Sequence, residues 1–360
     1  MDFHWLYIIL SFVLSLLSGF IITPHIVDFC LKRKLYDLPN ERKVHHNAIP
    51  RLGGVAFLPC MFLAFLLSLY VFKYTTDNLP FGISLWTGAF LVSLFVIYLI
   101  GLIDDVIGLG APIKFTAQII AASILPICNL YINNLYGFMG IHEVPFIVGA
   151  PLTVFVIVFI NNAINLIDGI DGLAGTLSLF FFVFYFIVAY TYTQLAILII
   201  TIPVIGALLP FLYFNLFGKA EKKKKIFMGD TGSLFIGFLI SVICIDITND
   251  SENILGATPI AVAYCPLIVP CFDLARVVIS RLYENRNPFK ADKTHLHHLI
   301  LSIVKSQKVT LLLIMTLALF ITSASILLSY DFNVNLVFMF DVMIWIMVMM
   351  VIYRKLKKNN

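Results

Sequence analysis

Residues 146–174 read FIVGAPLTVFVIVFINNAINLIDGIDGLA, a long apolar run that ends in a cluster of amides and carboxylates. A helix needs about 20 apolar residues to cross the hydrocarbon core of a bilayer, and the chain repeatedly exceeds that length. Of its 360 residues, 61% are hydrophobic and 12% are charged, whereas a soluble domain carries roughly 25% charged residues. Because backbone polar groups in lipid must be satisfied within the chain, the spans should be helices. The sequence therefore predicts an all-α polytopic membrane protein.

The hydropathy pattern predicts about eleven transmembrane helices within a single integral membrane domain, residues 1–360. The expected spans cover residues 5–30, 52–73, 84–103, 113–132, 146–164, 174–192, 195–217, 231–248, 257–281, 309–329 and 334–353. Segments 174–192 and 195–217 are nearly fused, so a count of ten spans stays open. The first segment has no Lys or Arg before Lys32. It therefore lacks the basic front end of a signal peptide, and we expect it to be retained.

Basic residues are distributed unevenly between alternate connections. All but one of the 24 Lys and Arg residues fall on the same side of the predicted spans, with Lys73 on the other. The positive-inside rule then places the N-terminus outside and the C-terminus in the cytoplasm, which requires an odd number of spans. The net charge of +4 comes from short clusters between apolar runs, which is not a nucleic-acid-binding pattern. We expect a multi-pass protein of the cytoplasmic (inner) membrane, with its active site on the cytoplasmic face.

Asp104 and Asp105 close the third predicted span at its C-terminal end. An Asp at the centre of a membrane helix costs roughly 2.5–3.5 kcal/mol on insertion scales, so the pair should lie at the interface. The alternative is a pair of solvated acids at a helix terminus. That alternative does not explain an acid pair at the end where the helix dipole disfavours anions. We therefore interpret the pair as functional, with Lys114 downstream as a countercharge.

The polar end of the 146–174 segment has the composition of a metal and phosphate site. If the helix continues that far, four residues at helical spacing share one face: Asn161, Asn165, Asp168 and Gly172. Amides and carboxylates are hard oxygen donors, which suit Mg²⁺ together with substrate phosphates. A DGxDG string alone could be a turn, so the constellation as a whole carries the interpretation.

Asp230 directly precedes another apolar span, in Met228-Gly229-Asp230-Thr231-Gly232-Ser233. On its own it could be a helix N-cap. Because it is also a carboxylate at the cytoplasmic end of a span, it is equally a candidate metal ligand. The two roles do not exclude each other.

Two further motifs combine basic residues and histidines. One segment contains Lys43, His45 and Arg51, followed by a Gly-Gly pair. This segment is either a positive-inside anchor or a basic, glycine-containing binding site for phosphate. His295, His297 and His298 could bind zinc, but no Cys or acid stands at a familiar zinc spacing. Contacts to phosphate or sugar fit these histidines better. The run from Lys222 to Lys225 is interpreted as a positive-inside anchor.

In their order along the chain, these motifs resemble the polyprenyl-phosphate N-acetylhexosamine-1-phosphate transferase family (glycosyltransferase family 4). The matching strings are His45-x-x-x-Ile-Pro-Arg51-x-Gly-Gly, Asp104-Asp105 with Gly108-Leu109 and Lys114, Asn161-x-x-x-Asn165-x-x-Asp168-Gly-x-Asp171-Gly-Leu-Ala, Gly229-Asp230-Thr-Gly-Ser233-Leu, and His295-x-His297-His298. Any one string is weak, whereas the ordered set is specific. The Ile-Pro-Arg-x-Gly-Gly and His-Leu-His-His strings resemble the branch that transfers GlcNAc-1-phosphate.

The resemblance implies that undecaprenyl phosphate attacks the β-phosphate of a UDP-N-acetylhexosamine and releases UMP. It implies that Asn165 and Asp230 hold Mg²⁺, with Mn²⁺ as an alternative, and that Asp104 acts as the base with Asp105 supporting it. Lys114 would neutralise phosphate charge, and the remaining substrate contacts would come from Lys43, His45, Arg51, Asp168, Asp171, His295, His297 and His298. The resemblance also suggests a homodimer. A covalent aspartyl-phosphate route stays open.

Three other functions fit these motifs less well. The peptidoglycan branch, which transfers phospho-MurNAc-pentapeptide, differs in the first loop and in the histidine motif. A transporter would carry its acids near the membrane midplane, whereas these acids lie at helix ends on one side. A CDP-alcohol phosphatidyltransferase needs Ala-Arg after its DG, which is absent after Gly169 and Gly172.

Overall fold

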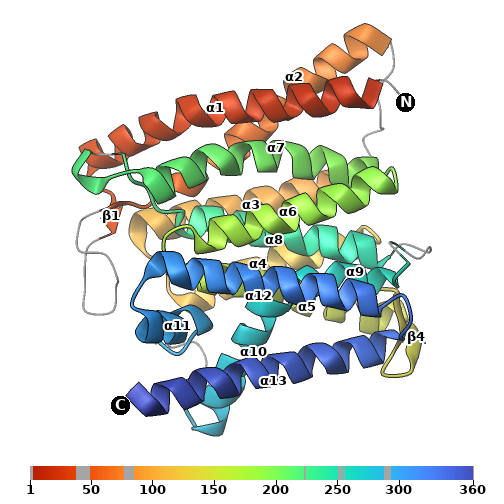
Figure 1. The fold of residues 1–360 in the computed structure, drawn as a ribbon. Coiled ribbons are helices and arrows are strands. Elements are labelled where there is room, and N and C mark those ends of the chain that lie inside the picture. Colours follow the sequence, from red (N-terminus) through yellow and green to blue (C-terminus); the bar gives the residue numbers. More distant parts are fainter. Residues whose placement is uncertain are drawn as a thin grey trace.

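The computed structural model describes residues 3–37, 49–76, 85–222, 224–249, 254, 256–287 and 293–359. They form a bundle of long helices that run back and forth between two ends (Figure 1). In chain order the helices are α1 Phe3–Arg33, α2 Phe57–Thr76, α3 Leu85–Ile107, α4 Ala111–Ile127, α5 Phe146–Ile167, α6 Leu173–Thr191, α7 Leu195–Leu212, α8 Gly229–Thr248, α9 Pro259–Tyr264, α10 Ile268–Tyr283, α11 Leu296–Val304, α12 Gln307–Leu328 and α13 Val334–Asn359. Two small antiparallel hairpins join them, β1 Tyr36–Asp37 with β2 Ile49–Pro50 and β3 Asn134–Phe138 with β4 Ile141–Glu143.

The predicted spans correspond closely to these helices. Within the described part of the chain, ten helical segments are long and apolar enough to cross a membrane. The expected span 113–132 is α4, which has 17 residues, because the chain leaves the helix at Cys128 and turns through Asn129 at a φ of 70°. The nearly fused segments stay separate as α6 and α7, since the chain turns at Thr193 with a φ of 55°.

The expected span 257–281 is a broken helix. It consists of α9, a 3₁₀ turn at Cys265–Leu267 and α10. Pro266 and Pro270 have no backbone N–H to donate, so regular α-helical bonding is interrupted at this point.

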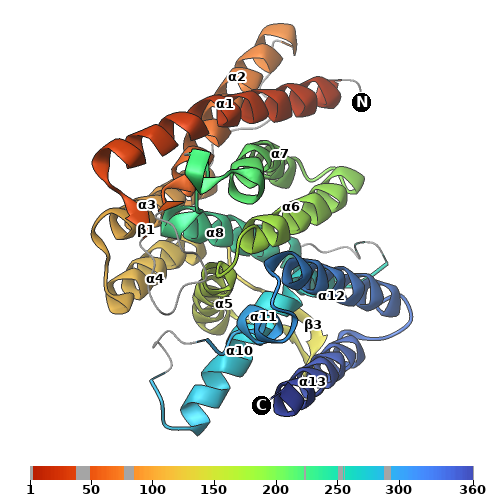
Figure 2. The ribbon, with the colours of Figure 1, turned by 60° about the vertical axis from the view of Figure 1, so that its left-hand side comes forward.

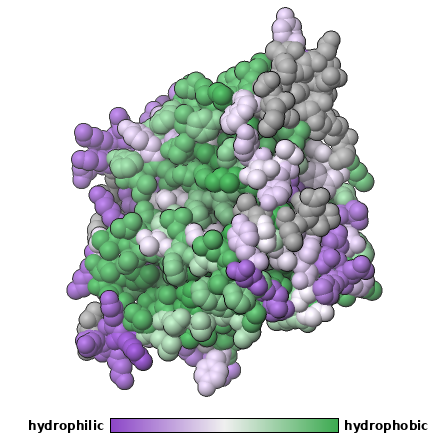
Figure 3. Space-filling model, turned by 45° about the vertical axis from the view of Figure 1, so that its right-hand side comes forward, coloured by the Kyte–Doolittle hydropathy of each residue, from purple (hydrophilic) through white to green (hydrophobic). Residues whose placement is uncertain are grey.

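A broad apolar band crosses the middle of the surface, with hydrophilic residues gathered at the two ends (Figure 3). Many large hydrophobic side chains on the outer helices are exposed, including Ile21 at 63% and Phe155 at 63%. In water such a surface would be a severe aggregation liability, whereas in lipid it is the expected one. The protein is a multi-pass membrane protein. The two ends of the chain lie at opposite ends of the bundle, as an odd number of crossings requires (Figure 1).

Helix α8 forms the centre of the bundle and is buried along nearly its whole length. It packs against α3 and α5 (Figure 2). A helix that is hydrophobic on all sides lies either in a protein core or in lipid, and the burial of α8 places it in the core. Close approach of α3 depends on Gly101, where an added Cβ would lie 2.6 Å from the Thr231 Cα and 2.8 Å from the Asp230 carbonyl oxygen. The contact fixes the start of α8 against the end of α3.

Gly101→Ala should therefore lower the free energy of unfolding by about 1–3 kcal/mol, the usual cost of overpacking. Gly88→Ala in the same helix is the matched control, because nothing lies within 4 Å of its added Cβ. Replacing that glycine should leave stability unchanged or raise it by up to about 1 kcal/mol through helix propensity. Thermal unfolding of both purified variants measures the difference, and equal midpoints would contradict the proposed α3–α8 contact.

Candidate active site

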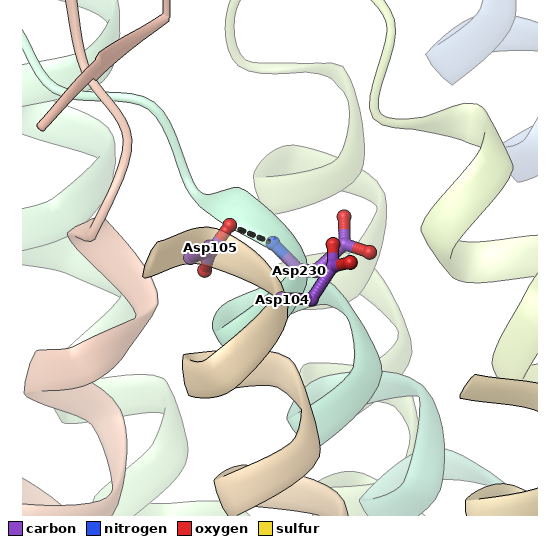
Figure 4. Close-up of side chains that lie close together, drawn as sticks. All are labelled: Asp104, Asp105 and Asp230. Atoms are coloured by element: carbon purple, nitrogen blue, oxygen red, sulfur yellow. Dashed lines mark hydrogen bonds between the residues drawn. The ribbon is translucent and has the colours of Figure 1, made fainter. Parts of the chain in front are cut away.

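Asp104 and Asp105 point in different directions from the last turn of α3, as neighbours about 100° apart on a helix should. Figure 4 shows the Asp104 carboxylate beside that of Asp230, whereas Asp105 turns to the opposite side and accepts a hydrogen bond from the Asp230 backbone. The two acids therefore have different partners and do different work.

Asp105 caps the first turn of α8 from another helix. Its Oδ1 accepts from the Asp230 N–H at 2.9 Å, and its Oδ2 accepts from the Thr231 N–H at 2.8 Å and the Thr231 hydroxyl at 2.6 Å. Only 4% of Asp105 is exposed. The first N–H groups of a helix have no partner within the helix and carry partial positive charge. Asp105 thus supplies the cap, and Asp230 lies inside the helix, so the N-cap interpretation of Asp230 is wrong.

Gly229 makes this approach sterically possible. Its φ is 73°, in the left-handed region, and an added Cβ would lie 2.5 Å from the Asp105 Oδ2. Glycine therefore satisfies both the backbone conformation and the space in front of Asp105.

Asp104, Lys114, Asn165 and Asp230 come together from α3, α4, α5 and α8. The Lys114 ammonium donates to the Asp230 Oδ2 at 2.5 Å and to the Asp104 Oδ2 at 3.2 Å. The Asn165 amide donates to the Asp230 Oδ1 at 3.2 Å and to the Ser233 hydroxyl at 2.8 Å. Lys114 is thus the countercharge of Asp104 and not of Asp105, which faces α8. The expected juxtaposition of Asn165 and Asp230 is present.

This cluster has the donor set of a divalent cation site. Asp104, Asp105 and Asp230 each offer one carboxylate oxygen, all within 4.8 Å of one another. Carboxylate oxygens suit a hard cation such as Mg²⁺. The Asp105 oxygens already accept bonds from α8, so Asp104 and Asp230 are the better placed ligands. Lys114 supplies one positive charge to these carboxylates, which leaves the cluster anionic.

The Asp168–Gly172 loop is a turn and does not continue α5. Helix α5 ends at Ile167, Gly172 adopts a φ of 78°, and α6 begins at Leu173. The predicted continuation of the helix through Asp168 and Gly172 is therefore wrong, whereas Asn161 and Asn165 lie one turn apart on the face of α5 that meets α8. Asn161 is fully buried, and it packs against Gly237, two turns further along α8 than Asp230.

Polar contacts fix the loop from its far side. The Lys225 ammonium pairs with the Asp171 carboxylate at 2.5 Å. The buried Asn215 side chain accepts from the Gly172 N–H at 2.6 Å and donates to the Ile226 carbonyl at 2.8 Å. Asp168 is exposed. At least one residue of the Lys222–Lys225 run thus has a specific partner beyond its role as an anchor.

The histidine motif packs against this loop. His297 is 1% exposed, and an added Cβ at Gly169 would lie 2.8 Å from its Cε1. Burial lowers the pKa of His297 to about 3, so the ring is neutral. The rings of His297 and His298 lie 4.1 Å apart. In the described part of the chain, the histidines form no three-ligand group with an acid or cysteine, which gives no support to zinc.

Arg51 lies in a segment that pairs with the approach to α8. The Phe227 N–H donates to the Pro50 carbonyl, and the N–H groups of Gly53 and Gly54 donate to the carbonyls of Phe227 and Met228, each at 2.8 Å. These bonds bring Arg51, the described residue of the first basic motif, beside Gly229 at the start of α8. Lys43 and His45 lie outside the described residues.

Sequence interpretation missed Asp273 and Arg276 of α10. The Asp273 Oδ2 lies 2.9 Å from the His295 Nδ1, and its Oδ1 accepts from the Leu296 N–H at 3.0 Å and from Arg276 at 2.7 Å. The available signal was an Asp and an Arg three residues apart in an otherwise apolar span, a spacing that places them on one helix face.

A model of glycosyl transferase family 4 matches residues 87–248, which run from the first turn of α3 to the end of α8 and include the whole acidic cluster. The probable undecaprenyl-phosphate N-acetylglucosaminyl 1-phosphate transferase of Bacillus subtilis is 32% identical over 358 residues, covering 97% of this chain and 92% of that protein. The chain belongs to glycosyl transferase family 4.

Two further relatives of this family agree with the assignment. The undecaprenyl-phosphate alpha-N-acetylglucosaminyl 1-phosphate transferase of Escherichia coli K12 is 29% identical, covering 88% of this chain and 84% of that protein. The protein of the same name from Yersinia pestis is 30% identical, covering 75% and 70%. The histidine motif of this family 4 member lies outside the matched residues 87–248.

Asp105→Asn should destabilise the protein, whereas Asp104→Asn should not. Hydrogen bonds to a charged group contribute about 1.5–3 kcal/mol each, and the amide would place its NH₂ against donors of α8. Asp104 accepts one backbone bond, from Leu109, and stands beside another carboxylate, so its neutralisation costs little. Thermal unfolding and amide exchange at residues 230–233 measure the contrast. Equal stability of the two variants would contradict the capping role of Asp105.

Proposed function

We propose that the protein transfers N-acetylhexosamine-1-phosphate, specifically GlcNAc-1-phosphate, from a UDP-sugar to undecaprenyl phosphate and releases UMP. The observation that carries the proposal is the anionic cluster of Asp104, Asn165 and Asp230 with Lys114, at one end of a membrane bundle. A water-soluble nucleotide sugar and a lipid phosphate can meet only at such a boundary. The names of the relatives support the choice of sugar and lipid.

The barrier to this reaction is charge repulsion, because one phosphate anion must approach another. Mg²⁺ held by Asp104 and Asp230, with the amide of Asn165, would neutralise charge on the diphosphate. The residues fit this role by type and by convergence. An oxygen of the lipid phosphate attacks the β-phosphorus, and the bond from that phosphorus to the bridging oxygen breaks as UMP leaves.

The side chains have separate roles in this scheme. Asp104 takes a proton from the lipid phosphate when that phosphate is monoanionic, and Lys114 compensates charge on the transferred phosphoryl group. Asp105 fixes the position of the first turn of α8, and therefore that of Asp230. Asp168, Asp171, Arg51 and His298 are proposed to contact the nucleotide or the sugar, with Lys43 and His45 contributing from residues outside those described.

The peptidoglycan branch is disfavoured by the relatives' names and by the His-Leu-His-His string. Transport is disfavoured because Asp104, Asp105 and Asp230 converge at one end of the bundle, whereas the acids of a transporter usually lie near the membrane midplane. We further propose a single domain in the cytoplasmic membrane, with the acidic cluster facing the cytoplasm. The homodimer suggested by the family stays a prediction.

The purified protein should release UMP from UDP-GlcNAc only when polyprenyl phosphate and Mg²⁺ are both present. Asp230→Ala should lower kcat by about 10²–10⁴-fold, since a metal contributes several kcal/mol and each 1.36 kcal/mol is tenfold. Asn165→Ala should raise the Mg²⁺ concentration needed for half-maximal rate. A panel of UDP-sugars tests the hexosamine. Near-normal turnover of Asp230→Ala at limiting Mg²⁺ would remove this residue from the metal site.

The orientation follows from the positive-inside rule. A reporter fused after Lys358 should be cytoplasmic, and one inserted near Asp77 should be external. Alkaline phosphatase and fluorescent-protein fusions distinguish the two compartments. Both reporters on one side of the membrane would contradict the orientation and the odd number of crossings.

A further inference from the structure

Asp273 is a carboxylate inside an apolar helix, and it lies apart from the acidic cluster. Only 2% of the residue is exposed. A buried charge is costly unless it is paired and hydrogen-bonded, so the contacts of Asp273 indicate what it is for. Outside α10, Asp273 forms hydrogen bonds with His295 and Leu296, both at the start of α11.

These contacts hold the start of α11 in place. Asp273 bonds to the His295 ring at 2.9 Å and accepts from the Leu296 N–H, the first of α11, at 3.0 Å. His295, at the N-cap position, provides no side-chain cap of its own. Arg276 donates to Asp273 at 2.7 Å and to the Thr294 carbonyl at 2.6 Å. Asp273 and Arg276 thus fix both the backbone and the first ring of the histidine motif.

The arrangement continues from His295 to the Asp168–Gly172 loop. The rings of His295 and His297 are stacked, with centroids 6.0 Å apart and an interplanar angle of 13°. The buried His297 ring then lies against Gly169, where an added Cβ would be 2.8 Å from one ring carbon and 2.9 Å from another. We call Asp273, His295, His297 and Gly169 the histidine brace.

We propose that Asp273 is a positioning residue that acts through the histidine brace to set the place of the Asp168–Gly172 loop. In this assignment His295 and His297 link Asp273 to the loop by packing and do not contact substrate. This role differs from the substrate contact expected of them from the sequence. The half-buried His298 keeps that role. The brace connects α10 and α11, outside the family match, to a loop inside it.

The inference has a structural arm that is independent of activity. Hydrogen exchange on the full-length protein in nanodiscs should show faster exchange in Asp273→Ala at residues 296–304 and at 168–172. Residues 234–248 of α8 should be unchanged, because the brace does not reach them. Faster exchange at 296–304 alone would overturn the coupling to the loop.

The kinetic arm rests on the proposed function. Outer contacts that orient a site typically change affinity or activity by about 10–100-fold, so Asp273→Ala should raise the KM for UDP-GlcNAc by about tenfold or more. The KM for polyprenyl phosphate and the Mg²⁺ dependence should stay within about twofold. A fall in kcat with an unchanged KM for UDP-GlcNAc would overturn the positioning role.

Asp341→Asn is the matched control. Asp341 is also a buried aspartate, 0% exposed on α13, and it accepts from Ser325 at 2.5 Å and Tyr264 at 3.2 Å. Neutralising it tests the general effect of losing a buried carboxylate. Exchange at 168–172 and the KM for UDP-GlcNAc should stay at wild-type values, and a change in either equal to that of Asp273→Ala would overturn the assignment.

Gly169→Ala tests the same contact from the loop side and does not depend on Asp273→Ala folding. It should speed exchange at 296–304, and the effect should disappear in a His297→Ala background, where the ring no longer meets the added methyl group. Additive effects of the two changes would overturn the brace. If the wild-type protein releases no UMP from any UDP-sugar, the proposed function fails while the exchange results still decide the brace.

Discussion

The arrangement of the site depends on one interaction, the capping of α8 by the carboxylate of Asp105. Helix α8 is surrounded on all sides, so the N–H groups of its first turn have little access to water and must find a partner inside the protein. From the end of α3, Asp105 accepts three hydrogen bonds from the first turn of α8. Since neighbouring side chains on a helix diverge, fixing Asp105 against α8 also places Asp104 beside the side chain of Asp230. The chemistry of the cluster is therefore a consequence of how a buried helix begins.

The same physical solution recurs at the histidine motif. Asp273 of α10 accepts from the first N–H of α11, and Asp105 of α3 accepts from the second and third N–H groups of α8. Asn215 accepts in a similar way from the Gly172 N–H, directly before α6. In each case a buried side chain from one element satisfies the start of another. Helix starts point partial positive charge toward this end of the bundle, where the substrates of the proposed reaction carry phosphates.

Charge balance explains why the cluster is suited to a cation. Lys114 contacts both Asp104 and Asp230, and in the described part of the chain it is the one lysine or arginine with an ion pair to these acids. Three converging carboxylates with one ammonium remain anionic. A divalent cation would offset this excess of negative charge, and it would also let a negatively charged diphosphate approach.

The loop that carries Asp168 and Asp171 is positioned separately, by Lys225 and Asn215 on one side and by His297 on the other.

The sequence by itself determined the helices and the chemistry-bearing residues. The length of an apolar run is set by bilayer thickness. Polar residues crowded at the end of such a run interrupt its apolar pattern, so Asp104, Asn165 and Asp230 could be recognised locally as functional candidates. Only the tertiary structure decided which member of the Asp104–Asp105 pair faces the cluster, where Lys114 pairs and why Asp273 is buried. These features depend on the rotation of one helix against another across separations such as the 125 residues between Asp105 and Asp230. The tertiary structure also determined that α5 ends at Ile167. The loop that follows is held by Asn215 and His297, and no local sequence pattern links these two residues to the loop.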